Sequence, residues 1–128
     1  MRDDKENVII DLTFKFAIGI INYSDELEGQ KKYVLARQLL KSDTSIGANS
    51  SEAQNAESKA DFIHKFKIAA KEADETEYWL MLCKASKDYP NPDSLLKEIT
   101  SYHKDNFQDN IIGKRINVRP SFSNFQIA

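Results

Sequence analysis

The chain has 128 residues, of which 41% are hydrophobic and 30% charged, and its formal net charge is −2. These values are typical of a soluble, globular single domain with one core, and they exclude a wholly disordered chain. No apolar run reaches the roughly 18 residues of a membrane span, and the charged residues at positions 1–6 are unlike a secretory signal.

A first helix is predicted over residues 7–25. Its apolar residues are so closely spaced that few positions are fully polar, and we therefore expect this helix to be buried on more than one side. They are Val8, Leu12, Phe14, Phe16, Ala17, Ile18, Ile20 and Ile21. Gly19 lies among them and favours a close crossing with another helix. Residues 25–32, which contain Gly29, are predicted to form the first turn.

A second helix is predicted over residues 33–55. One face repeats at alternating steps of four and three residues, the spacing of helices that pack in bundles. This face consists of Leu35, Leu39, Ser42, Ile46, Asn49 and Ala53. Ser42 and Asn49 are polar, and a buried polar group needs a hydrogen-bond partner. Two interpretations stay open: these residues set the register of the helices, or they line a ligand pocket in the bundle centre.

A third, long helix is predicted over residues 58–86, and the rest of the chain is organised around it. Ser58 is a suitable N-cap, and Asp61 stands where a capping box has its acidic residue. The main seam keeps a seven-residue period, which predicts a left-handed supercoil. It consists of Phe62, Phe66, Ala69, Ala73, Thr76, Leu80 and Cys83. We therefore expect Cys83 to be a buried, inert thiol.

A second stripe runs along the third helix beside the main seam. It consists of Ile68, Glu72, Glu75, Trp79 and Leu82. Between positions 78 and 83 the helix is apolar all the way round. Because a helix of a monomeric bundle needs only one buried face, the second stripe predicts the contact surface of a homo-oligomer.

A break with two prolines, at residues 87–93, ends the third helix. A fourth helix follows, capped by Asp93 or Ser94. Its inner side carries Leu95, Leu96, Ile99 and Tyr102. The chain changes character after His103, and the apolar pattern fades after Phe107.

Four helices joined by short connections predict an all-α fold, an antiparallel up-down-up-down four-helix bundle. The bundle domain is predicted over residues 1–103, with a shortened or irregular fourth helix. Residues 104–128 are predicted to be an irregular C-terminal tail, because their apolar residues show no helical period.

No group of residues predicts an enzyme, a cofactor or a metal site. Asp61 and His64 have the spacing of one element of a carboxylate-bridged metal site, but such a site needs a second element and two further carboxylates. The chain has no glycine-rich phosphate loop and no nucleophile elbow. His103 is expected on the surface. The acidic cluster is expected to be a solvated face, because its members point in different directions: Glu72, Asp74, Glu75 and Glu77.

The cysteine count and the charge distribution restrict location and partners. Cys83 is the only cysteine, which excludes an intramolecular disulfide and favours a reducing cytoplasm. Residues 1–57 carry seven Lys/Arg and ten Asp/Glu, a net charge of −3. Residues 58–101 carry seven and eight, or −1, and residues 102–128 carry four and two, or +2. An acidic body does not favour broad binding to nucleic-acid phosphates.

Several stretches of the second and third helices resemble the four-helix-bundle proteins named after the 23S ribosomal RNA intervening sequence. They are Leu39-Leu40-Lys41-Ser42, Ser45-Ile46-Gly47-Ala48-Asn49, Glu52-Ala53, Ser58-Lys59-Ala60-Asp61-Phe62, Lys67-Ile68-Ala69, Lys71-Glu72-Ala73 and Glu75-Thr76-Glu77-Tyr78-Trp79-Leu80. The resemblance covers about residues 7–101. Two features depart from it: Ser50 stands where the family usually has an apolar residue, and the family continues the fourth helix for several more turns. A shifted reading frame near Lys104 would produce the tail of this chain.

The resemblance implies a bundle that assembles as a ring, typically a pentamer. It implies a small bacterial protein, and most members are without an established activity. A related branch binds nucleic acid through a strongly basic surface. We therefore expect a non-enzymatic oligomeric scaffold or interaction protein, with an RNA- or DNA-binding accessory protein as the alternative.

Overall fold

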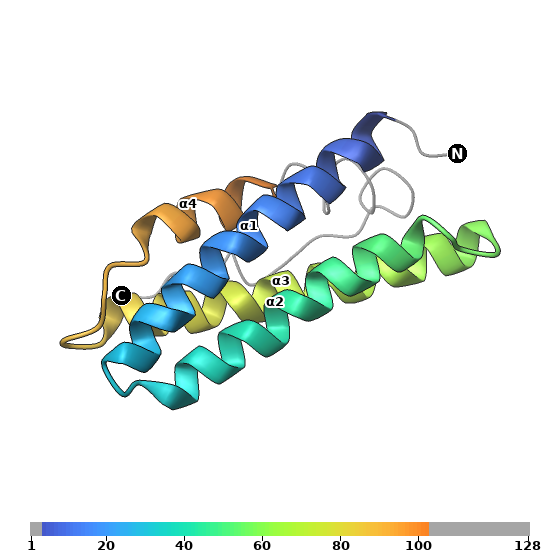
Figure 1. The fold of residues 1–128 in the computed structure, drawn as a ribbon. Helices are drawn as coiled ribbons and strands as arrows, with labels where there is room; N and C mark the ends of the chain where they lie inside the picture. Colours follow the sequence, from blue (N-terminus) through green and yellow to red (C-terminus); the bar gives the residue numbers. More distant parts are fainter. Residues whose placement is uncertain (1–3, 103–128) are drawn as a thin grey trace.

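The computed structural model describes residues 4–102, and within them it contains four α-helices and no strand. The helices are α1 (Asp4–Gly29), α2 (Tyr33–Ala53), α3 (Lys59–Ala85) and α4 (Asp93–Tyr102). Successive helices run in opposite directions in an up-down-up-down bundle (Figure 1). The predicted all-α class is confirmed. The predicted domain boundary at residue 103, the tail over residues 104–128 and the position of His103 lie outside the described residues.

Each of the four helices packs against two others. α2 packs against α1 and α3, and α4 packs against the same two helices. At 1.5 Å per residue, α1 is about 39 Å long and α4 only about 15 Å. The described α4 therefore lies along one part of α1, and no other helix among residues 4–102 lies along the rest of that side (Figure 1).

Polar contacts hold α4 and the connection that precedes it. The hydroxyl of Tyr23 on α1 donates a hydrogen bond to the carbonyl of Pro90. The hydroxyl of Thr100 on α4 donates to Oε2 of Glu77 on α3 at 2.9 Å. Glu77 is only 5% exposed, so the prediction that it belongs to a solvated acidic face is wrong. The reason is that α4 covers this side of α3, which the periodicity of α3 alone does not reveal.

The core follows the predicted seam of α3. Phe66, Ala69, Ala73, Thr76, Leu80 and Cys83 are buried, and Phe62 is partly buried with its ring centroid 5.0 Å from that of Phe66. The other helices contribute Ile9, Phe16, Ile20, Leu27, Ala36, Leu39, Ile46, Ala53 and Ile99. One continuous core therefore joins all four helices.

The predicted seam of α2 is wrong at two positions. Ala36 is buried where Leu35 was expected, and Ser50 is buried where Asn49 was expected. The buried residues still keep a seven-residue repeat, but the row of Ala36, Asp43 and Ser50 takes the place of the predicted row of Leu35, Ser42 and Asn49. The buried face is thus turned toward the neighbouring row, while Leu35 packs at its edge and Ser42 is buried as well. Asn49 is half-buried and its amide donates to the carbonyl of Ser45 on the same helix at 2.9 Å.

The helix ends combine predicted and unpredicted caps. Ser58 is the N-cap of α3, and its side chain accepts a hydrogen bond from the backbone N–H of Asp61, as predicted. For α4, the expected caps Asp93 and Ser94 are wrong. The Asn91 side chain accepts from the N–H of Asp93 at 2.8 Å, because Asp93 is already the first helical residue.

The first turn is shorter than predicted. α1 continues through Gly29, and only residues 30–32 connect it to α2. The N–H of Lys32 donates to the carbonyl of Leu27 at 2.8 Å, and Lys31 has a left-handed φ of 64°. This is the geometry of a helix C-cap, in which backbone N–H groups beyond the helix donate hydrogen bonds to its last carbonyls. Lys31, and not the glycine, therefore occupies the left-handed position.

Two glycines inside helices give a matched pair of stability predictions. A Cβ on Gly47 would meet no atom within 4 Å, so Gly47→Ala is expected to raise the free energy of unfolding by about 1 kcal/mol, the usual helix preference for alanine. A Cβ on Gly19 would lie 2.8 Å from Cδ2 of Leu95, so the Leu95 side chain or α4 must shift, and Gly19→Ala should gain less or destabilise. Urea unfolding followed by circular dichroism measures both. Equal gains would show that α4 does not pack closely on Gly19.

Candidate functional site

The predicted contact stripe lies along one side of α3, and the chain itself covers part of it. Ile68, Glu72, Trp79 and Leu82 are half-buried, and Glu75 is exposed. Since successive helical residues turn by about 100°, these five positions fall on one sector of the helix. The structure thus places them together. Their contact with a second chain remains a prediction.

Trp79 is the largest residue of this stripe. Its side chain packs against the core, and its ring centroid lies 5.2 Å from that of Tyr78 in an edge-to-face arrangement. The indole Nε1 is buried and has no hydrogen-bond partner. A buried N–H without an acceptor is unfavourable by about 1–3 kcal/mol. This end of α3 is therefore less completely satisfied than the core.

Two carboxylates of the stripe interact with each other. Burial, followed by the hydrogen bond and negative charge of Glu75, raises the pKa of Glu72 above its usual range. The charges of Lys71 and of Lys41 on α2 oppose this shift of the Glu72 pKa. Lys41 therefore connects the outer side of α2 electrostatically with the stripe on α3.

A larger exposed apolar surface lies on α1, where the sequence did not predict it. Phe14 is 69% exposed, Ile18 is 47% exposed and Ile21 is 49% exposed. Their spacing of four and three residues places them in one row on the helix. The expectation that α1 is buried on more than one side is therefore wrong for this single chain. The sequence signal was present, because these three residues alternate with the buried set that contains Phe16 and Ile20.

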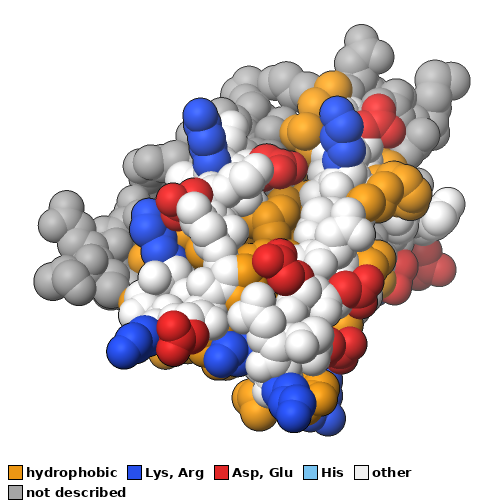
Figure 2. Space-filling model, turned by 60° about the vertical axis from the view of Figure 1, so that its left-hand side comes forward, with side chains coloured by type: hydrophobic (Ala, Val, Ile, Leu, Met, Phe, Trp, Pro, Cys, Tyr) orange, Lys and Arg blue, Asp and Glu red, His pale blue; other side chains and the backbone are white. Residues whose placement is uncertain are grey.

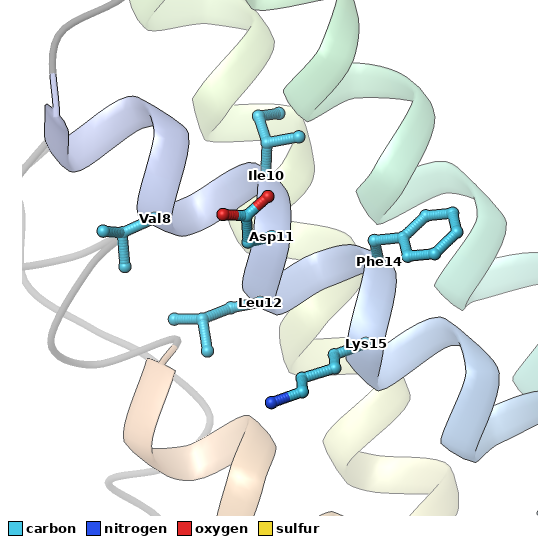
Figure 3. Close-up of a pocket in the computed structure, with 6 residues that line it drawn as sticks. All are labelled: Val8, Ile10, Asp11, Leu12, Phe14 and Lys15. Carbon is cyan, nitrogen blue, oxygen red and sulfur yellow. The ribbon is translucent and has the colours of Figure 1, made fainter.

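A hollow of about 550 Å³ lies beside the N-terminal half of α1 and is shown in Figure 3. It is lined by Val8, Ile10, Asp11, Leu12, Phe14 and Lys15. Figure 3 shows Val8 and Leu12 on the side of α1 toward α4, and Phe14 on the other side, toward α2. The lining groups thus point away from one another around one helix. Such an arrangement does not bring an acid, a base or a nucleophile to a common point.

Two polar residues of the helix seam, Ser42 and Thr76, are hydrogen-bonded within the bundle, whereas Oγ of Ser50 is buried without a partner. The hydroxyl of Thr76 on α3 donates to the hydroxyl of Ser42 on α2 at 2.7 Å, and Ser42 in turn lies 3.4 Å from the carbonyl of Leu39. Thr76 and Ser42 are both buried. This contact supports the interpretation that polar seam residues set the register of the helices. It does not support the alternative of a ligand pocket in the bundle centre.

The residues considered for metal binding or thiol chemistry have structural surroundings. Oδ2 of Asp61 accepts from the N–H of Glu57 at 3.2 Å, while His64 is exposed. Among residues 4–102, no three His, Cys, Asp or Glu side chains are grouped as metal ligands. Cys83 is buried, as expected, and burial raises the pKa of its thiol. A raised thiol pKa lowers the thiolate fraction and hence the reactivity.

One ionisable residue in the core was not foreseen. Asp43 on α2 is only 3% exposed, and burial raises the pKa of its carboxyl from 3.8 to about 7. Ser42, one position earlier, faces α3. A turn of about 100° per residue places Asp43 at the other edge of the buried face, on the side of α1. A charged side chain is seldom buried without a partner, so periodicity gave no reason to expect it.

Asp43 is expected to make the stability of the protein dependent on pH. Its folded-state pKa is above its unfolded value, so the folded protein binds the proton more tightly and the free energy of unfolding falls as pH rises from about 4 to about 7. Relative to the wild type, Asp43→Asn should gain about 3 kcal/mol of stability between pH 5 and pH 8. Urea unfolding at both pH values measures this gain, with Glu98→Gln on the exposed side of α4 as control. If the free energy of unfolding changed equally between pH 5 and pH 8 in Asp43→Asn and in the wild type, the burial of this carboxyl would be contradicted.

The described residues contain no helix that is both long and apolar enough to cross a membrane.

Comparison with known proteins shows the family of the chain. The sequence profile of the family described as 23S rRNA-intervening sequence protein matches residues 5–104. A crystal structure of a protein of unknown function from the S23 ribosomal protein family of Bacteroides thetaiotaomicron VPI-5482 is 42% identical, with a TM-score of 0.76. The match covers 84% of this chain and 97% of that chain. A search among curated proteins gives no significant match. The chain therefore belongs to the family of 23S rRNA-intervening sequence proteins.

Proposed function

We propose that this protein is a non-enzymatic scaffold that assembles into a homo-oligomer in the cytoplasm. The observation that carries the proposal is the exposure of large apolar side chains. Within the described residues, seven of them are between 38% and 69% exposed: Val8, Phe14, Ile18, Ile21, Tyr33, Val34 and Tyr78. Burial of such surface is favourable by about 25 cal/mol per Å², so association of copies would gain several kcal/mol. A pentameric ring is the form that the family resemblance implies.

The stripe on α3 is the first contact surface that we propose for this assembly. It combines apolar and carboxylate side chains, and it lies next to the cationic Lys41 on α2. Such a mixture of a small apolar centre and charged neighbours is common at interfaces between subunits. Trp79 is the residue expected to contribute most, because buried tryptophans dominate many interfaces.

Nucleic-acid binding is the competing function, since the family is described by a ribosomal RNA sequence. The net charge of −2 gives it little electrostatic support. On the face drawn in Figure 2, Lys/Arg and Asp/Glu side chains are interspersed around apolar groups and do not form a continuous basic field. Proteins that bind phosphates through many contacts normally carry such a field.

Light scattering on the full chain tests the proposal. The wild type is expected to have a mass several times the 14.7 kDa of one chain at tens of micromolar. The double variant Trp79→Glu, Leu82→Lys should remain helical by circular dichroism and have a lower mass. The matched control Ser94→Glu, Glu98→Lys introduces the same two residues on the exposed side of α4 and should leave the mass unchanged.

Three outcomes separate the possibilities. A wild type of monomer mass would contradict the scaffold function. A wild-type oligomer with an unaffected Trp79/Leu82 variant would place the contact elsewhere than on the α3 stripe. Tight binding of structured RNA that persists when salt is raised, measured by fluorescence anisotropy, would favour the nucleic-acid function instead.

A further inference from the structure

The apolar row on α1, formed by Phe14, Ile18 and Ile21, has an acidic border. Within the same sector of the helix, Asp11, Asp25 and Glu28 are all exposed. Lys15 lies outside this sector, and Figure 3 shows it pointing away from Phe14, on the side of Leu12. The row thus combines a contiguous apolar centre with charges of one sign.

The outer side of α2 has the opposite character. Tyr33 is 50% exposed and Val34 is 69% exposed, and both belong to the first turn of the helix. Arg37 and Lys41 are exposed and follow on the same sector at spacings of about one turn. This face therefore combines apolar side chains with positive charges.

We infer that the apolar row on α1 of one copy binds the outer side of α2 of a second copy. The inference rests on the proposed homo-oligomer and names its contact surfaces. The apolar centres of the two faces would cover each other, while the acidic border of α1 meets Arg37 and Lys41. Opposite charges across an interface steer association and select the correct pairing.

The charges also decide against other occupants of the row on α1. Two α1 rows facing each other would bring Asp11, Asp25 and Glu28 of both copies together, and like charges in contact are unfavourable. A membrane surface is disfavoured, because helices that lie on anionic lipids carry Lys and Arg beside their apolar face. Nucleic acid is disfavoured as well, because its phosphates carry the same negative charge as the border of this row.

The consequence is a contact between two different faces of the same chain. Such a contact is heterologous, so each copy has one α1 face and one α2 face to offer. Repetition of the contact produces a closed ring, or an open filament if the rotation does not close. The outer side of α2 borders the α3 stripe through Lys41 and Glu72, so both proposed surfaces belong to one side of the subunit.

A disulfide experiment tests which faces meet. Ile18→Cys and Val34→Cys are made separately in the full chain, with Cys83 kept because it is buried, and the two chains carry different affinity tags. Co-expressed chains are purified as mixed assemblies and oxidised with copper phenanthroline. A covalent dimer with both tags is expected in at least severalfold excess over dimers with one tag. Ser94→Cys on the exposed side of α4 is the control position and should give little cross-linking with either.

Phe14→Glu, Ile18→Glu provides an independent readout, because it adds negative charge to an acidic face and should reduce the oligomer to single chains that remain helical. Dimers of Ile18→Cys alone would overturn the inference in favour of an α1-to-α1 contact. No mixed dimer together with an unaffected Phe14/Ile18 variant, in a wild type that is oligomeric, would also overturn it but leave the scaffold function intact. A monomeric wild type would contradict both.

Discussion

Close packing between α2 and α3 is the interaction on which the rest of the structure depends. Small buried residues are frequent on both helices: Ala36, Ser42, Ser50 and Ala53 on α2, and Ala69, Ala70 and Ala73 on α3. Small side chains let two helix backbones approach, and the larger Phe66 and Leu80 fill the space between layers. The hydrogen bond between Ser42 and Thr76 links the two helices inside the core, and each hydroxyl also bonds to a backbone carbonyl of its own helix.

This pair of helices determines what is left for α1 and α4. α1 packs against α2 and α4 and buries Phe16 and Ile20, while Phe14, Ile18 and Ile21 are exposed. The described α4 has ten residues and approaches α1 at Gly19 through Leu95, and the connection before it bonds to Tyr23. The result is a bundle with a complete centre and an incompletely covered outer surface. An unpaired apolar surface is the physical reason to expect association.

The sequence predicted the centre of the molecule better than its surface. The seam of α3 was correct because a long, regular pattern of apolar residues leaves little choice of buried face. In α2 the core contains Ser50 and not the predicted Asn49, because the buried face follows the row of Ala36, Asp43 and Ser50. Two of these three residues are polar, so hydrophobicity gave no signal for this row. Glu77 could not be assigned from α3 alone, because its burial depends on where α4 lies and on a hydrogen bond from Thr100.

In the candidate site, too, the sequence revealed some residues and not others. The stripe that contains Trp79 could be recognised in the sequence, because its apolar and charged residues recur at helical spacing. The row on α1 was hidden, since most positions between Val8 and Ile21 are apolar and periodicity could not separate the inner side from the outer. Asp43 was missed for a different reason: charged residues are normally exposed, and only its position between two packed helices reveals the burial.

The central claim is that the outer apolar surface is covered by other copies of the chain, so folding and assembly are coupled. The most direct test is the melting temperature of the wild type as a function of protein concentration. If copies stabilise one another, the melting temperature rises by several degrees over about a hundredfold increase in concentration, because mass action favours the assembled state. A melting temperature that stays constant over this range would mean that the single chain is stable with its apolar surface exposed, and would contradict the account.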